Sequence, residues 1–149
     1  MVCIAVCLCA FTACAGKNQA ASLEDIYASL QKVSNMPEMS VMPDSLIETL
    51  FGFDTAMFEE YVFAEAAYPD VNADVIILAK VRDKADIDTV SSTLDGYLSS
   101  VKDYTQSYSP VNYEKTSNSK VSILGNCVFL IITAEYFEAE QVVINGLNG

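Results

Sequence analysis

The chain has 149 residues, 20 of them acidic and 8 basic, so its formal net charge at pH 7 is −12. This length is typical of one domain, and 52% hydrophobic with 19% charged residues indicates a folded globule rather than a disordered chain. Nucleic-acid-binding domains gather Lys and Arg into a basic patch, whereas the basic residues here are scattered, so we expect no nucleic-acid partner.

Residues 2–11 form an apolar run, VCIAVCLCAF, and Thr12, Ala13 and Cys14 follow it. A short apolar core before small residues is the pattern of a secretory signal, and this run is shorter than the roughly 20 apolar residues that cross a bilayer. Cysteine after Thr-Ala resembles the lipobox of bacterial lipoproteins, in which the thiol carries a diacylglyceryl group. We therefore predict a signal peptide over residues 1–13 and a lipid on Cys14 that anchors the protein to the outer face of the cytoplasmic membrane.

Two features depart from that pattern, because Phe11 stands where Leu is usual and no charged residue precedes Lys17. An ordinary cleaved signal, with a cysteine beside the cut by chance, is the alternative. Residues 14–21 are interpreted as a tether, followed by a single domain over residues 22–149.

The cysteines favour no metal or catalytic site. Four of the five lie within the first 14 residues, and the chain has no His to join them as a zinc ligand. The fifth, Cys127, lies in an apolar segment, and without His it lacks the base that a reactive thiolate needs. We expect Cys127 to be a buried apolar residue, and we predict no metal, cofactor or catalytic residue.

Two helices are expected in the first third of the domain. Ser22 precedes apolar residues at helical spacing, which predicts a helix over residues 22–34. A shorter one begins at Asp44 or Ser45 and ends before Gly52.

Met36, Met39 and Met42 lie between these helices. Thioethers bind copper(I) in exported proteins, but methionines more often fill gaps over a core. Because no His or Cys joins the group, packing is favoured.

Two strands follow, over residues 60–66 and 73–82, with a turn at 68–70 between them. The short connection predicts antiparallel neighbours. Both faces of the second strand are apolar, which predicts a central strand covered on both sides. At its ends, Asp74 is interpreted as a turn residue and Lys80 as a strand-end charge.

A long amphipathic helix begins at Asp83 or Asp86 and runs to Tyr108, with an apolar or tyrosine residue every three or four positions. Its acidic start has a calcium-site interpretation. The run lacks the glycine and the bidentate Glu of an EF-hand loop, and carboxylates are common helix caps, so capping is favoured.

The remaining segments complete the predicted fold. Residues 109–119 are expected to form a loop, 120–124 and 127–133 a hairpin, and 136–144 a last helix capped by Asn145-Gly146. This order indicates an α+β fold: a four-stranded, mainly antiparallel sheet packed by the long helix and by shorter N- and C-terminal helices.

Four tyrosines, Tyr97, Tyr104, Tyr108 and Tyr113, lie in or near the predicted loop. Tyrosine offers flat contact area with a polar tip, so Tyr108 and Tyr113 are candidates for a surface that binds sugars or peptides. The alternative is that the three helical tyrosines lie on the core face of their helix.

The segments NADVIILAKV (72–81) and LGNCVFL (124–130) resemble a family of bacterial lipoproteins known as domain of unknown function 4358. Val75 replaces the usual Glu of that family, and Cys127 the usual Tyr. The resemblance implies the fold and the envelope location, and it adds no chemistry.

Two functions remain. The first is a non-catalytic binding or accessory module of the cell envelope, with an unknown protein, peptide or envelope glycan as its partner. The second is a secreted hydrolase that uses paired carboxylates, which cleave glycosidic bonds when they flank one cleft.

Overall fold

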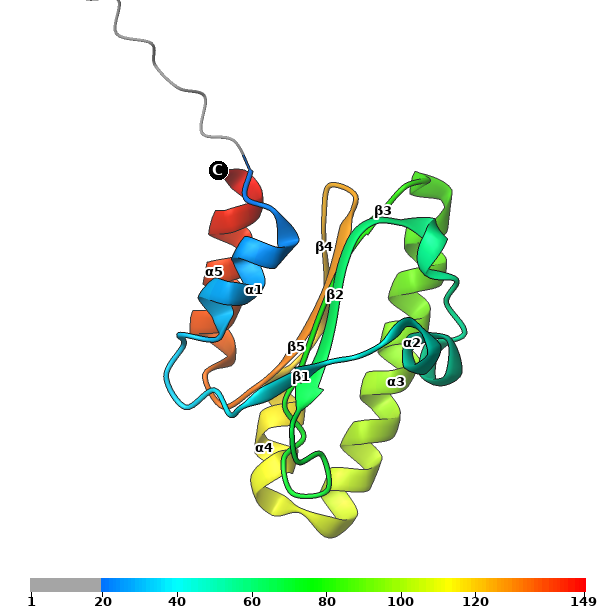
Figure 1. Cartoon of the computed structure of the whole chain (residues 1–149). Coiled ribbons are helices and arrows are strands. Elements are labelled where there is room, and N and C mark those ends of the chain that lie inside the picture. The colour runs from blue at the N-terminus through cyan, green and yellow to red at the C-terminus, as the bar shows by residue number, and fades with distance from the viewer. Residues whose placement is uncertain (1–19) are drawn as a thin grey trace, which may run out of the picture.

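The computed structural model describes residues 20–149, so the predicted signal peptide and Cys14 lie outside the described residues. Five strands form one sheet in the order β1-β2-β3-β5-β4, with every neighbouring pair antiparallel (Figure 1). The strands are β1 (Met39–Val41), β2 (Phe58–Ala66), β3 (Val75–Val81), β4 (Val121–Leu124) and β5 (Cys127–Ile132). The helices are α1 (Leu23–Leu30), α2 (Asp44–Phe51), α3 (Ile87–Tyr108), α4 (Pro110–Asn118) and α5 (Tyr136–Asn148), with short 3-10 turns η1 (Thr55–Met57) and η2 (Lys84–Asp86).

The predicted α+β class is confirmed, with five strands instead of four. The missed strand, β1, lies at the sheet edge and pairs with residues 64–66 of β2. It has three residues, which is too short for an alternating pattern to be visible in the sequence.

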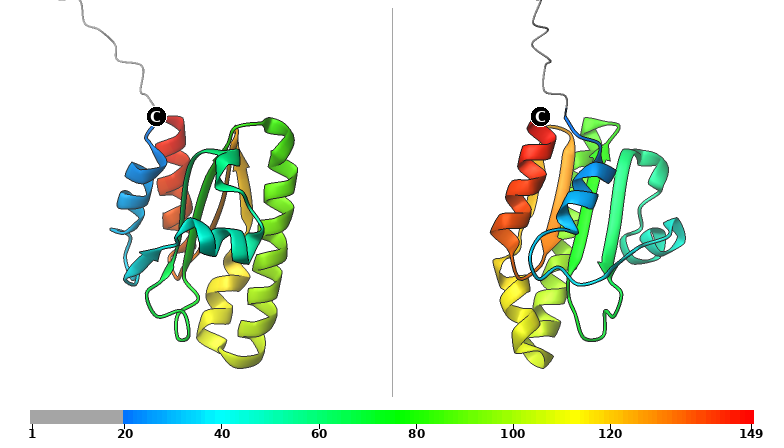
Figure 2. Two further views of the ribbon diagram at one scale, coloured as in Figure 1. Left: turned by 45° about the vertical axis from the view of Figure 1, so that its right-hand side comes forward. Right: turned by 60° about the vertical axis from the view of Figure 1, so that its left-hand side comes forward.

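β3 is the central strand, as predicted, and both of its faces are buried. Val75, Ile77 and Ala79 pack on one side against α2 and α3. Ile76 and Leu78 pack on the other side against α1 and α5. The sheet is therefore the middle of three layers, with α2 and α3 on one face and α1 and α5 on the other (Figures 1 and 2).

The layer of α1 and α5 explains a glycine that the sequence analysis assigned to a helix end. Gly146 lies inside α5, which continues to Asn148. A Cβ at this position would lie 2.6 Å from Ile26 Cγ1 of α1. Glycine is present because the two helices approach closely, and the predicted cap is wrong.

Residues 109–119, predicted as a loop, are mostly the helix α4. Pro110 occupies its first turn, where a proline costs no hydrogen bond. The buried residues of α4 are Asn112 and Thr116. Because its buried face is polar, α4 has no apolar stripe that would mark it in the sequence.

The structure bears on two sites discussed from the sequence, the acidic start of the long helix and Cys127. Asp83 Oδ1 accepts a hydrogen bond from the Ala85 N–H at 2.9 Å, which supports capping over a calcium site. Cys127 is buried, and burial raises the pKa of its thiol to about 11, so it is an unreactive core residue.

The three methionines divide between the two cores. Met42 is buried on the α2–α3 side, whereas Met36 and Met39 pack against the α1–α5 side. This division supports packing over a copper site. Within residues 20–149, no helix is both long and apolar enough to cross a membrane.

Candidate functional site

The long helix α3 extends past the end of the sheet. Its 22 residues span about 33 Å at ~1.5 Å per residue, whereas the seven residues of β3 span about 23 Å at ~3.3 Å each. The last turns of α3 therefore have no strand beneath them. Opposite them lie α4 and the β2–β3 loop, which we define as residues 67–74 (Figure 1).

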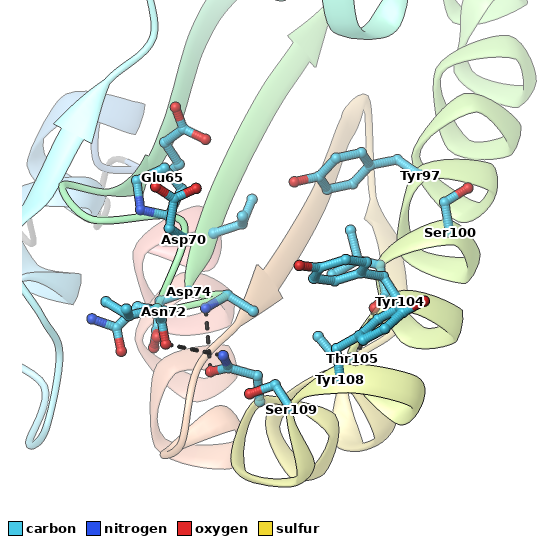
Figure 3. A pocket seen from close by; sticks show the side chains of 16 residues that line it. Glu65, Asp70, Asn72, Asp74, Tyr97, Ser100, Tyr104, Thr105, Tyr108 and Ser109 are labelled. Carbon is cyan, nitrogen blue, oxygen red and sulfur yellow. Dashed lines mark hydrogen bonds between the residues drawn. The ribbon is translucent and has the colours of Figure 1, made fainter.

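A pocket of about 550 Å³ lies between α3 and the β2–β3 loop (Figure 3). We call it the tyrosine pocket. One wall comes from α3, the other from the β2–β3 loop and the adjoining strand ends, and the floor from the α3–α4 corner. Its lining residues are Glu65, Pro69, Asp70, Val71, Asn72, Ala73, Asp74, Val75, Tyr97, Ser100, Val101, Tyr104, Thr105, Tyr108, Ser109 and Asn112.

Two of its tyrosines are exposed, although the pattern of α3 placed them on the core face. Tyr104 is 63% exposed and Tyr108 75%, and their ring centroids lie 5.1 Å apart with the planes tilted by 39°. The apolar stripe of α3 continues past the sheet, so these rings face the pocket instead of a core. The alternative interpretation, in which the helical tyrosines pack in the core, therefore does not hold for Tyr104 and Tyr108.

Tyr97 lies about two turns before Tyr104 on α3 and is half-buried. Its ring contacts Phe51 edge-on, with centroids 5.0 Å apart, and its hydroxyl points across the pocket towards the wall that holds Glu65 and Asp70 (Figure 3). Burial, and secondly the negative charge of Glu65, raise the pKa of Tyr97 to about 12. Tyr97 is therefore a neutral hydroxyl at physiological pH.

Polar side chains of α4 hold the β2–β3 loop in place. Asn112 Nδ2 donates to the Val71 carbonyl at 3.0 Å, and Asn112 Oδ1 accepts from the Ala73 N–H at 3.3 Å (Figure 3). Lys115 Nζ donates to Asp74 Oδ2 at 2.6 Å. These contacts fix the β2–β3 loop as one wall of the tyrosine pocket.

The Asp74–Lys115 ion pair is the most buried of the pairs within residues 20–149. The Asp74 side chain is fully buried, and 14% of the Lys115 side chain is exposed. Asp74 is thus more than the turn residue that the sequence suggested. Its second oxygen, Oδ1, is buried and has no hydrogen-bond partner among the described residues.

The charge of the pocket is one-sided. Glu65, Asp70 and Asp74 line it, and none of its lining residues, all from the described part of the chain, is basic. Among residues 20–149, no three His, Cys, Asp or Glu side chains are grouped so that they could hold a metal ion.

The structure separates the two tyrosines proposed as a binding surface. Tyr108 lines the pocket, whereas Tyr113 is half-buried on α4 and is not among the lining residues. Asn112 and Lys115, which hold the β2–β3 loop, were not predicted as site residues from the sequence. Their spacing of three residues puts them on one helical face, a signal that can be read only once α4 is assigned as a helix.

A comparison with protein-family models matches residues 31–133 to the model described as "Domain of unknown function (DUF4358)". No curated protein and no solved structure matches the chain. The matched region runs from the end of α1 to the end of β5 and contains every residue that lines the tyrosine pocket. Because this match covers more than half of the chain, the protein belongs to the DUF4358 family.

Proposed function

We propose that the protein is a non-catalytic binding module of the cell envelope, anchored through a lipid on Cys14, and that its ligand occupies the tyrosine pocket. The observation that carries the proposal is a pocket of about 550 Å³ at which Tyr104 and Tyr108 are exposed. Tyrosines are enriched among the residues that dominate binding energy at interfaces. A pocket of this volume lies in the range of roughly 300–1,000 Å³ that is common for ligand sites.

The position of the pocket relative to the predicted tether supports this proposal. The Ala21 N–H donates to the Gly146 carbonyl at 2.8 Å, and Ala20 and Ala21 lie near the β4–β5 turn. That turn is at the end of β3 opposite the pocket, because the Val81 N–H donates to the Asn126 carbonyl there. An anchor before residue 20 would thus attach the domain at the end of β3 opposite the pocket, about 23 Å away by the length of β3.

The chemistry of the pocket supports binding over catalysis. Its hydroxyl groups have no His beside them, since the chain contains none, and the Asp74 carboxylate is committed to Lys115. The hydrolase alternative would then depend on Glu65 and Asp70. Turnover of a glycan by the purified protein, abolished by Glu65→Gln, would replace the binding proposal.

Site-specific photo-cross-linking in intact cells tests the binding site. With p-benzoylphenylalanine in place of Tyr104, we expect a covalent adduct, because this position faces the ligand. With the same group in place of Tyr68, which is also exposed and lies in the β2–β3 loop but outside the pocket lining, we expect none.

Adding Tyr108→Ala to the position-104 variant should remove the adduct, since it deletes half of the exposed ring pair. Equal adducts from positions 104 and 68, or an adduct that is unchanged by Tyr108→Ala, would contradict the proposed site. An absence of any adduct from position 104 would do so as well.

The anchor has a separate test. Cells fed a labelled fatty acid should incorporate label into the wild-type protein, whereas Cys14→Ser should remove it completely because the acceptor thiol is gone. The mass of the purified mature protein should differ accordingly. Equal labelling of the two proteins would show that Cys14 carries no lipid.

A further inference from the structure

We infer that the tyrosine pocket binds a cationic side chain, preferentially arginine, carried by a peptide segment of a partner protein. This inference rests on the proposed binding function and names the class of ligand that the pocket takes.

The negative charge of the pocket lining favours a cation. Lys115 compensates Asp74, so Glu65 and Asp70 remain as two uncompensated carboxylates on one wall of the pocket. The chain as a whole carries a net charge of −12, which adds a long-range field of the same sign. A cation entering the pocket meets no like charge among its lining residues.

The opposite wall of the pocket carries tyrosine rings, which also attract a cation. The face of a tyrosine ring is electron-rich and attracts a cation within about 6 Å of the ring centroid. Tyr104 and Tyr108 present an exposed ring pair on this wall, and Tyr97 reaches across the pocket towards Glu65 (Figure 3). A planar guanidinium can stack on a ring while its N–H groups bind a carboxylate in bidentate fashion. These two walls therefore suit arginine better than lysine.

The carboxylate of Asp74 also has an oxygen without a hydrogen-bond donor in the described part of the chain. Asp74 Oδ1 has no donor among the described residues, although Asp74 lines the pocket and is 99% buried, with 1% of its surface exposed. A buried acceptor without a donor is unfavourable. A cation bound beside this wall would stabilise the Asp74 carboxylate through its charge.

These features discriminate against the glycans of the cell envelope. A neutral sugar could stack on Tyr104 and Tyr108, but it would leave the charges of Glu65 and Asp70 without a counter-charge. A sugar that carries phosphate or carboxylate would be repelled by the same two residues. A basic peptide uses both walls.

The test is an NMR titration of the isotope-labelled full-length protein in detergent micelles. The probe is acetyl-Ala-Ala-Arg-Ala-Ala-amide, and its control is the same peptide with citrulline, which keeps the shape of arginine without its charge. We expect the arginine peptide to shift resonances of the pocket and to bind at least ~10-fold more tightly than the citrulline peptide. Its affinity should fall as salt is added.

Matched variants locate the effect. The double variant Glu65→Gln/Asp70→Asn should remove the preference for arginine over citrulline. Asp95→Asn removes a charge from an exposed position of the same helix α3 outside the pocket lining, and it should leave that preference unchanged.

Equal affinity for the two peptides, or a preference that survives the double variant, would overturn the inference. If chitotetraose shifts the pocket resonances and the peptides do not, the cationic ligand is wrong while the binding function stands. If none of the probes shifts them, the cationic ligand is again wrong, and the cross-linking from position 104 decides the binding function independently.

Discussion

Lys115→Met is expected to destabilise the protein by about 3–5 kcal/mol, the usual cost of leaving one charge of a buried pair without its partner. The Asp74 carboxylate is fully buried, its Oδ2 lies 2.6 Å from Lys115 Nζ, and its Oδ1 has no other partner among the described residues. Removing the lysine therefore leaves a buried carboxylate without a counter-charge. A loss of this size is a large share of the roughly 5–15 kcal/mol by which domains are stable.

Urea unfolding followed by circular dichroism measures this effect. Lys120→Met is the matched control, because 63% of the Lys120 side chain is exposed, although its partner Glu140 is only 13% exposed. Solvent screens the Lys120 charge, so its loss should cost less than the loss of Lys115. The double variant Asp74→Asn/Lys115→Met should be less destabilised than Lys115→Met alone, since it removes both charges. Equal losses for Lys115→Met and Lys120→Met would contradict the structural role of the buried pair.

Gly146→Ala should destabilise the protein by about 1–3 kcal/mol, the usual cost of overpacking a core, although alanine is the better helix former by ~1 kcal/mol. The new Cβ would lie 2.6 Å from Ile26 Cγ1 and 2.9 Å from Ile26 Cδ1. Ile26 cannot rotate away cheaply, because a β-branched side chain has one preferred rotamer in a helix. Either Ile26 leaves that rotamer or α1 and α5 move apart.

The sign of the change in stability shows whether the clash with Ile26 is its cause. On an Ile26→Ala background the clash is absent, so adding Gly146→Ala should be neutral or stabilising. Gly96→Ala, in α3, has no heavy atom within 4 Å of the new Cβ and should stabilise by roughly 0.5–1 kcal/mol through helix propensity alone. A stabilising Gly146→Ala in the wild-type protein would show that the two helices do not press together there.

Local periodicity predicted the elements whose buried face is apolar. The apolar run of β3, the stripe of α3 and the hairpin around Gly125 all follow this rule, and together they determine the α+β class. Helix α4 was missed because Asn112 and Thr116, which are polar, are the residues that it buries. A hydrophobic pattern cannot reveal a helix that is held by hydrogen bonds and an ion pair.

The candidate site was harder to predict for a different reason. Periodicity assigns a residue to a face of its helix, but it does not say whether another element covers that face. Tyr104 and Tyr108 continue the stripe of α3, yet α3 is longer than the strand it packs against, so they line a pocket. Gly146 shows the same limit, since the neighbour that requires a glycine is more than a hundred residues away in the chain.

Because α3 extends past the end of the sheet, the residues that stabilise the fold differ from the residues that line the tyrosine pocket. The sheet and its two cores determine whether the protein folds, whereas the exposed tyrosines and the acidic wall lie beyond the end of the sheet and contribute little to either core. Substitutions at Asp70, Tyr104 or Tyr108 should therefore change the shape and charge of the tyrosine pocket at little cost in stability.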